Sequence, residues 1–208
     1  MKVVIVGAGG HGTIVADILQ RAATPPVAFV DEALSGATVA GMRVVGSIDD
    51  VEHDAVIVAI GDNRVRRGVT ERLLSAGERL ATAIHPFSSI APSATIGEGS
   101  MICAGAIVSP RAVIGRGALL NTKSSVDHDS VVGDFVHVAP GATLGAHVRI
   151  GEETLIGPGV TVVSGRSVGA RTVIGAGAVV VHDITDDVTA LGVPARVTSG
   201  RRSEESSR

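Results

Sequence analysis

Residues 90–120 read IAPSATIGEGSMICAGAIVSPRAVIGRGALL, and every sixth residue of this stretch is aliphatic. The same frame continues without a break to residue 180. Its sixteen positions are Ile90, Ile96, Ile102, Val108, Ile114, Leu120, Val126, Val132, Val138, Leu144, Ile150, Ile156, Val162, Val168, Ile174 and Val180. A small residue often follows four positions later, as at Ala94 and Ser100. This period predicts a coil with three flat sides, whose successive turns pair as parallel strands about 4.8 Å apart. Sixteen hexads give roughly five turns.

Two details refine the expected coil. Glycine often directly follows the aliphatic residue, at Gly97, Gly115, Gly133, Gly145, Gly151, Gly157, Gly169 and Gly175. We expect these glycines to adopt corner backbone angles that a side chain would penalise. Arg166 stands where a small inward residue is expected, which predicts a local bulge or an outward turn.

The first part of the chain has a different pattern. Apolar runs at residues 3–6, 27–30 and 55–60 predict strands, and residues 13–23 and 65–76 predict helices between and after them. This alternation indicates a small α/β domain with three or four parallel strands. We therefore divide the chain into an α/β domain at 1–85, a coil at 86–198 and a disordered tail at 199–208.

A glycine motif connects the first predicted strand and helix. Gly7, Gly9 and Gly12 fit the pattern G-x-G-x-x-G, and Asp31 follows about 20 residues later. This motif favours an NAD-dependent oxidoreductase, but the α/β part is about half of a full dinucleotide fold and the rest is a coil. A glycine-rich turn at a helix N-terminus could instead hold the phosphates of another nucleotide, or could bind nothing.

Composition excludes several classes of function. The 208 residues carry a formal net charge of −3, without a basic block before the tail, so nucleic acid is not an expected partner. Cys103 is the sole cysteine, which rules out a disulfide framework. The opening apolar run is too short for a signal peptide or a membrane span. We expect a cytoplasmic protein without a membrane partner.

Four sequence features together resemble one family. They are GAGGHG at 7–12, the hexads, NTKSSVDHD at 121–129 and GVPAR at 192–196. The combination resembles the NeuD/PglD-type sugar acyltransferases, which acetylate sialic acids or UDP-linked 4-amino sugars. The resemblance implies a Rossmann-like domain followed by a left-handed parallel β-helix, because the period alone leaves the handedness open. It also implies acetyl-CoA as co-substrate, no metal, and a homotrimer with active sites between subunits.

His128 is the strongest candidate for a catalytic residue. It projects near a corner of the coil, flanked by Asp127 and Asp129. Acyl transfer needs a base for the attacking amine or hydroxyl, and histidine titrates near neutrality. The resemblance implies a His followed by an acid, usually Glu, so the shorter Asp129 makes the reach to the imidazole an open point. By the same resemblance, His137 would contact the acetyl end of acetyl-CoA.

The resemblance also assigns binding residues. The coenzyme would lie along the coil beside Pro158, Ala176, Gly192 and Pro194. The nucleotide sugar would lie on the α/β domain, beside Gly9, Gly10, His11, Asp31, Glu32, Gly61, Asn63 and Arg64. Of the other histidines, we expect His85 to be structural and His53, His147 and His182 to be solvated.

The predicted reaction is N-acetylation of a nucleotide-linked 4-amino sugar, with His128 as general base. O-acetylation of a sialic acid or another sugar hydroxyl is an alternative, since it needs the same base. A non-catalytic solenoid used for binding or as a scaffold is an alternative of another class.

Overall fold

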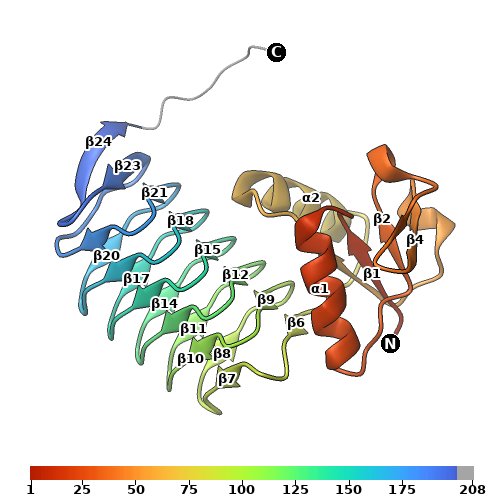
Figure 1. The fold of residues 1–208 in the computed structure, drawn as a ribbon, viewed down its shortest axis with the longest axis horizontal. Helices are drawn as coiled ribbons and strands as arrows, with labels where there is room; N and C mark the ends of the chain where they lie inside the picture. The colour runs from red at the N-terminus through yellow and green to blue at the C-terminus, as the bar shows by residue number, and fades with distance from the viewer. Residues whose placement is uncertain (201–208) are drawn as a thin grey trace.

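The computed structural model describes residues 1–200, and it consists of an α/β domain beside a long coil (Figure 1). Residues 201–208 of the predicted tail lie outside the described residues, whereas Ser199 and Gly200 belong to the last strand. In the described part of the chain, neither helix is long and apolar enough to cross a bilayer.

The α/β domain is a five-stranded sheet in the order β3-β4-β2-β1-β5. Its elements are β1 (Val3–Val6), α1 (Gly10–Arg21), β2 (Ala28–Val30), η1 (Glu32–Leu34), β3 (Thr38–Val39), β4 (Met42–Val45), η2 (Ile48–Asp50), β5 (Ala55–Val58) and α2 (Asn63–Ser75). The core strands pair in parallel as predicted, but the β3–β4 hairpin was not predicted. Its turn is Ala40-Gly41, both at positive φ, and two-residue hairpin turns of this kind give only a weak signal without Asn or Asp.

The coil is a parallel β-helix with three faces built from two-residue strands, and face 3 ends in the longer antiparallel pair β23 and β24. Face 1 contains β7 (Ser89–Ile90), β10 (Ile107–Val108), β13 (Ser125–Val126), β16 (Thr143–Leu144), β19 (Thr161–Val162) and β22 (Val179–Val180). Face 2 contains β8 (Thr95–Ile96), β11 (Val113–Ile114), β14 (Val131–Val132), β17 (Arg149–Ile150) and β20 (Ser167–Val168). Face 3 contains β6 (Ala83–Ile84), β9 (Met101–Ile102), β12 (Leu119–Leu120), β15 (His137–Val138), β18 (Leu155–Ile156), β21 (Val173–Ile174), β23 (Val188–Leu191) and β24 (Arg196–Gly200).

The predicted aliphatic series forms the core of this coil. Each aliphatic residue is the second residue of its strand and pairs with the residue 18 positions away, as Val126 does with Leu144. From Ile102 to Val180, all of them are buried in one continuous cluster. Burying a Val, Leu or Ile side chain contributes about 1.5–3 kcal/mol, so the stack of aliphatic side chains is the main stabilising element of the coil.

The glycines after the aliphatic residues have a different role from the predicted one. None of these eight has a positive φ. They are required because successive turns approach closely at the corners: a Cβ on Gly133 would lie 2.8 Å from the Glu152 nitrogen. The left-handed backbone occurs two residues later, at every sixth position from Gly99 to Gly177. Half of these positions are not glycine, namely Arg111, Lys123, Asp129, Phe135, His147, Glu153 and Arg171.

Of the two alternatives predicted for Arg166, the structure shows the outward turn of the side chain and not the bulge. The Arg166 carbonyl accepts the regular hydrogen bond from Arg149 at 3.0 Å, and the β17–β20 register is unbroken. The side chain is 39% exposed and lies 3.8 Å from Asp183. A tilt of the side chain alone therefore accommodates the large residue.

The two parts of the molecule share a hydrophobic core. Side chains of α1, including Val15 and Leu19, cluster with Met101 and Leu119 on the outer side of face 3. β6 pairs in parallel with β9, so strand pairing in the coil starts at Ala83, before Pro86. The α/β domain is thus packed on face 3 at the start of the coil (Figure 1).

A fully buried arginine of α2 strengthens this contact. The Arg66 guanidinium donates to the carbonyls of Gly117 (2.8 Å) and Phe135 (2.9 Å) on the coil. Within its own domain it donates to the Ile60 carbonyl (2.9 Å) and to Asn63 Oδ1 (2.8 Å). Desolvation lowers the pKa of Arg66 to about 10, which leaves it charged at neutral pH. Backbone carbonyls therefore bind this buried cation directly, while the charges of Asp62 and Glu153 offset part of the cost of its burial.

Candidate functional site

His128 and Asp129 form a hydrogen-bonded pair at the corner between faces 1 and 2. The corner is the turn between β13 and β14, where Asp129 adopts φ 59°. His128 Nδ1 lies 2.7 Å from Asp129 Oδ2, and the backbone nitrogen of His128 donates to Asp127 Oδ1 at 2.7 Å. An ionised carboxylate accepts, so Nδ1 carries the proton and the lone pair is on Nε2. The shorter acid therefore does reach the imidazole.

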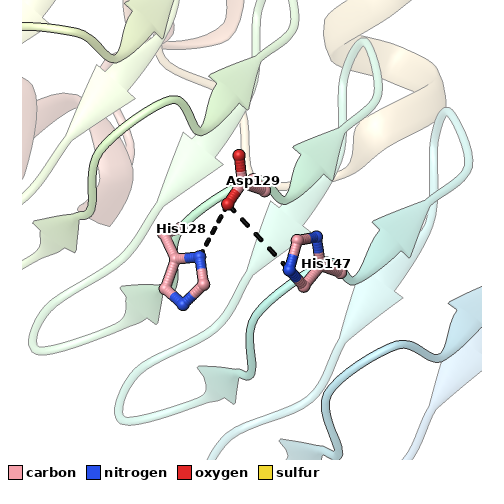
Figure 2. Close-up of side chains that lie close together, drawn as sticks. All are labelled: His128, Asp129 and His147. Atoms are coloured by element: carbon pink, nitrogen blue, oxygen red, sulfur yellow. Dashed lines mark hydrogen bonds and ion pairs between the residues drawn. The ribbon is translucent and has the colours of Figure 1, made fainter.

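Neighbouring turns place two further side chains beside Asp129. Arg111, 18 residues earlier, donates from Nε and Nη2 to the two carboxylate oxygens, each at 2.7 Å. His147, 18 residues later, lies 4.0 Å from Asp129 Oδ2, and its ring meets that of His128 edge-on at 5.3 Å. Figure 2 shows Asp129 between the two imidazoles. Hydrogen bonds from Arg111 and then His128 hold the pKa of Asp129 well below its usual range.

His128, Asp129 and His147 also have the ligand types of a metal site, with their ligand atoms within 4.8 Å of one another. Both oxygens of Asp129 are already used by Arg111, however. A guanidinium beside the carboxylate competes with a cation for it and repels the cation. We therefore assign no metal to this cluster.

His137 lies elsewhere, on the outer side of face 3 where the α/β domain packs. Asn121 Nδ2 donates to His137 Nε2 at 3.2 Å, and the amide is oriented by a bond from the Thr122 nitrogen to Asn121 Oδ1 at 2.8 Å. Burial, followed by the charge of Arg66, lowers the pKa of His137 to about 3. The ring is therefore neutral, with its proton on Nδ1.

His11, from the glycine loop, faces His137 across the contact between the domains. Their ring centroids are 6.1 Å apart. Burial and then the charge of Arg66 lower the pKa of His11 as well. Its Nε2 is buried without a hydrogen-bond partner among residues 1–200. An unpaired buried polar atom is costly, so this nitrogen is a point where a bound molecule would supply the missing bond.

The other residues predicted to bind the sugar nucleotide mostly follow the C-terminal ends of β1, β2 and β5, on the same edge of the sheet as His11. Gly9 is the N-cap of α1 and Gly10 its first residue, and both are exposed. Asp31 accepts hydrogen bonds from the nitrogens of Ala8 (3.0 Å) and Ala33 (3.1 Å). Its carboxylate therefore fixes the glycine loop. Glu32, which follows it, is exposed.

Asn63 has a different role from the predicted one. Its amide nitrogen donates to the carbonyls of Glu153 and Thr154 on the coil, each at 3.1 Å, and its oxygen accepts from Arg66. No donor of this amide is left for a nucleotide, so we correct Asn63 to an interdomain contact. The Gly61 carbonyl also accepts from Arg66, at 3.2 Å, whereas Arg64 is exposed.

The predicted coenzyme residues share a third location, the corner between faces 3 and 1. Pro158 and Ala176 are 18 residues apart, at equivalent places in successive turns, and both are exposed. Gly192 (φ 97°) and Pro194 follow β23 on the same side.

The candidate residues of one chain do not converge on one point. The His128 pair is at the corner between faces 1 and 2, the coenzyme residues are at the corner between faces 3 and 1, and the α/β domain covers face 3. One full side of the coil separates His128 from either group.

The remaining histidines differ in part from expectation. His53 is not solvated: its side chain is 13% exposed, with Nδ1 2.6 Å from the Val51 carbonyl and Nε2 2.9 Å from Glu78. His147 is 64% exposed but belongs to the Asp129 cluster. His182 is exposed, as expected. His85 is buried and accepts from the Phe87 nitrogen at 3.0 Å, in keeping with a structural role.

Family models match both parts of the chain. The PglD N-terminal domain matches residues 2–73, and the bacterial transferase hexapeptide (six repeats) matches residues 147–182. The first match includes the glycine loop, so this loop belongs to a PglD N-terminal domain rather than to an NAD-dependent oxidoreductase.

Among curated proteins, UDP-N-acetylbacillosamine N-acetyltransferase of Bacillus subtilis (strain 168) is 36% identical over 114 residues. The match covers 50% of this chain and 51% of that enzyme, so the chain spans about half the length of this curated relative.

Solved structures match almost the entire chain. The acetyltransferase domain of PglB from Neisseria gonorrhoeae FA1090, in complex with acetyl coenzyme A, is 39% identical with a TM-score of 0.91, covering 95% of this chain and 98% of that chain. PerB from Caulobacter crescentus, in complex with CoA and GDP-perosamine, is 36% identical with a TM-score of 0.91, covering 96% and 98%. The chain therefore belongs to the PglD-type family of hexapeptide-repeat sugar acetyltransferases, with a Rossmann-like domain followed by a left-handed parallel β-helix.

Proposed function

We propose that the protein transfers the acetyl group of acetyl-CoA to the amino group of a nucleotide-linked 4-amino sugar. The observation that carries this proposal is the His128–Asp129 pair, whose 2.7 Å bond leaves Nε2 free as a base. The relatives support the substrate class, because one is named for a UDP-linked amino sugar and another binds GDP-perosamine with CoA. A UDP-linked sugar is the first candidate for the acceptor.

The proposed chemistry is a direct attack of the sugar amine on the thioester. The amine nitrogen forms a bond to the carbonyl carbon while His128 Nε2 takes a proton from it. The C–S bond then breaks, and the proton passes from His128 to the leaving sulfur. Asp129 keeps the imidazole in the tautomer with Nδ1 protonated and stabilises the imidazolium that forms during the step.

His137 suits a different task, stabilisation of the thioester oxygen. Its ring is neutral and Asn121 occupies its Nε2, so Nδ1–H is a donor. A donor directed at the carbonyl oxygen stabilises the negative charge that develops there. We therefore assign His137 to the acetyl end of the coenzyme and Pro158, Ala176, Gly192 and Pro194 to the rest of it. Gly9, Gly10, His11, Asp31, Glu32, Gly61 and Arg64 remain the proposed sugar-nucleotide residues.

We propose a homotrimer in which each active site lies between two chains. The separation of His128 from the coenzyme residues in one chain supports this assembly, because a neighbour's corner could complete the site. Ile107 on face 1 and Val113 on face 2 support it too: they are 47% and 41% exposed and flank the corner that carries Arg111. Exposed aliphatics on flat faces favour a subunit contact. Ile107→Asp should give monomers in light scattering, and an unchanged mass would contradict this assembly.

The central experiment measures release of free thiol from acetyl-CoA with a panel of UDP- and GDP-linked 4-amino sugars. The His128→Ala variant should lose about 10²–10⁴-fold in kcat while binding acetyl-CoA normally by calorimetry. Unchanged turnover in this variant would sink the assignment of the base. Turnover with sugar hydroxyls but not with amines would favour O-acetylation. Absence of turnover with every acceptor would favour the scaffold alternative.

We place the reaction in the cytoplasm, in keeping with the single cysteine.

A further inference from the structure

Arg111 makes a bidentate hydrogen bond to Asp129, the acid of the proposed catalytic pair. Its Nε and Nη2 each lie 2.7 Å from a different oxygen of Asp129. Two parallel bonds fix the plane of a carboxylate as well as its position. Asp129 Oδ2, the oxygen that accepts from His128, is one of the two oxygens held in this way.

Stability alone does not account for this contact. The Arg111 side chain is 64% exposed, and exposed ion pairs contribute about 0–1 kcal/mol. What distinguishes this contact from other exposed ion pairs of the coil is its acceptor, because the same carboxylate accepts from His128 Nδ1. A bidentate bond to that carboxylate points to a role in the site.

Without Arg111, Asp129 would have another partner within reach. His147 Nε2, from the following turn of the coil, lies 4.0 Å from Asp129 Oδ2, whereas Arg111 comes from the preceding turn. Rotation of the free carboxylate toward His147 would lengthen its bond to His128. Aspartate has one side-chain torsion fewer than glutamate, so a small rotation at χ1 displaces both oxygens.

We propose that Arg111 is a positioning residue for the acetyl-transfer reaction, which holds the Asp129 carboxylate on His128 and away from His147. The inference rests on the proposed role of His128 as the base. The hydrogen bond from Arg111, followed by the one from His128, also lowers the pKa of Asp129, so its carboxyl stays ionised. In this arrangement the histidine base is oriented by a residue from the preceding turn of the coil.

The experiment compares steady-state thiol release by Arg111→Ala, Arg111→Lys and Arg171→Ala. Arg171 is a matched control, because it makes the same bidentate hydrogen bond to Asp187, at 2.8 and 2.7 Å, on another corner. Arg111→Ala should lower kcat about 10- to 100-fold with little change in KM. The pKa of the Asp129 carboxyl, followed by NMR, should rise in the same variant, because the hydrogen bond from Arg111 is the largest cause of its lowering. Lysine, which cannot make two parallel bonds, should restore this pKa and kcat only in part.

A double-mutant cycle with Asp129→Ala separates positioning from a general structural effect. In the absence of Asp129, removing Arg111 should have no further effect on kcat. Additive losses, or equal losses in Arg171→Ala and Arg111→Ala, would overturn the proposal. If the wild-type protein releases no thiol with any acceptor, the proposed function itself fails. Active wild type with unaffected Arg111→Ala refutes the positioning role alone.

Discussion

At the scale of single residues, the pair His11 and His137 makes stability depend on pH. Burial holds both imidazoles neutral, with the pKa of His137 at about 3. In the unfolded chain the pKa of histidine is about 6.5. Between these values the unfolded state binds a proton that the folded state does not. The unfolding free energy therefore loses nothing to these two residues above about pH 6.5, and it falls as the pH is lowered toward 3.

We expect His137 to cost roughly 1–2 kcal/mol of unfolding free energy between pH 7 and pH 5. Urea unfolding of the wild type and of His137→Asn gives the unfolding free energy at each pH in this range. The effect of His137 is the difference between the two proteins in the slope of this free energy against pH. His53→Gln is the contrasting variant. The bonds of His53 to Val51 and Glu78 raise its pKa, so its stabilisation is present at low pH and lost on raising it. If the unfolding free energies of His137→Asn and wild type have the same slope against pH, His137 is not the buried neutral imidazole that causes the acid loss of stability.

The sequence predicts the His128–Asp129 pair, our proposed catalytic pair, better than the residues around it. His128 and Asp129 are adjacent, so their contact follows from local geometry. Arg111 and His147 are 18 residues away on either side and meet Asp129 only because three hexads close one turn. Their positions could have been found by counting 18 residues from Asp129. The burial of His53 depends on its contact with the distant Glu78, and no local signal indicates it.

At the scale of elements, two classes of glycine shape the corners of the coil. Gly133 leaves room for the next turn, and an added Cβ would lie 2.8 Å from the Glu152 nitrogen. Gly141 has φ 69° and open space around its Cβ position. The two glycines therefore exclude side chains for different reasons, steric contact in one case and backbone angle in the other.

Gly133→Ala should destabilise the protein by about 2–3 kcal/mol, because one of two packed turns must shift. Gly141→Ala should cost about 1 kcal/mol, the strain of a left-handed alanine. Thermal unfolding of the two variants shows which substitution destabilises the protein more. A larger loss for Gly141→Ala would show that backbone angle, rather than close approach, limits the corners.

The hexads predict almost every strand of the coil because inward packing repeats with the same period as the backbone. They do not reveal how a corner is built, and the glycine role was assigned to the wrong cause for that reason. In the α/β domain, buried apolar runs mark β1, β2 and β5. The two-residue strand β3 is too short to show a pattern of its own.

At the scale of the molecule, Arg66 fixes the α/β domain to the coil. Its donors satisfy carbonyls on two turns of the coil and at the end of β5. Removing the side chain would leave these carbonyls unpaired in a buried contact. The sequence gives no sign of this role, because an arginine in an amphipathic helix is ordinarily expected on the surface.

Arg66→Met should lower the unfolding free energy by about 3–5 kcal/mol, and Arg72→Met, at an exposed position of the same helix, should change it little. Urea unfolding gives the comparison, and limited proteolysis should show earlier cleavage of the α/β domain in Arg66→Met. Equal stability of the two variants would show that the apolar contact with α1 alone holds the domains together.

The contacts of α2 lie on the same three turns of the coil as Arg111, Asp129 and His147. Arg66 and Asn63 bind the carbonyls of Gly117, Phe135 and Glu153. These residues follow Arg111, Asp129 and His147 by six positions each, so the same three turns carry both sets. An extra turn inserted in this stretch would shift His128 along the coil relative to the α/β domain. An 18-residue unit gained or lost beyond residue 176 would leave these contacts unchanged and would displace only the proposed coenzyme residues Gly192 and Pro194. The repeat is therefore uniform in sequence, but its turns differ in what a change of length would disturb.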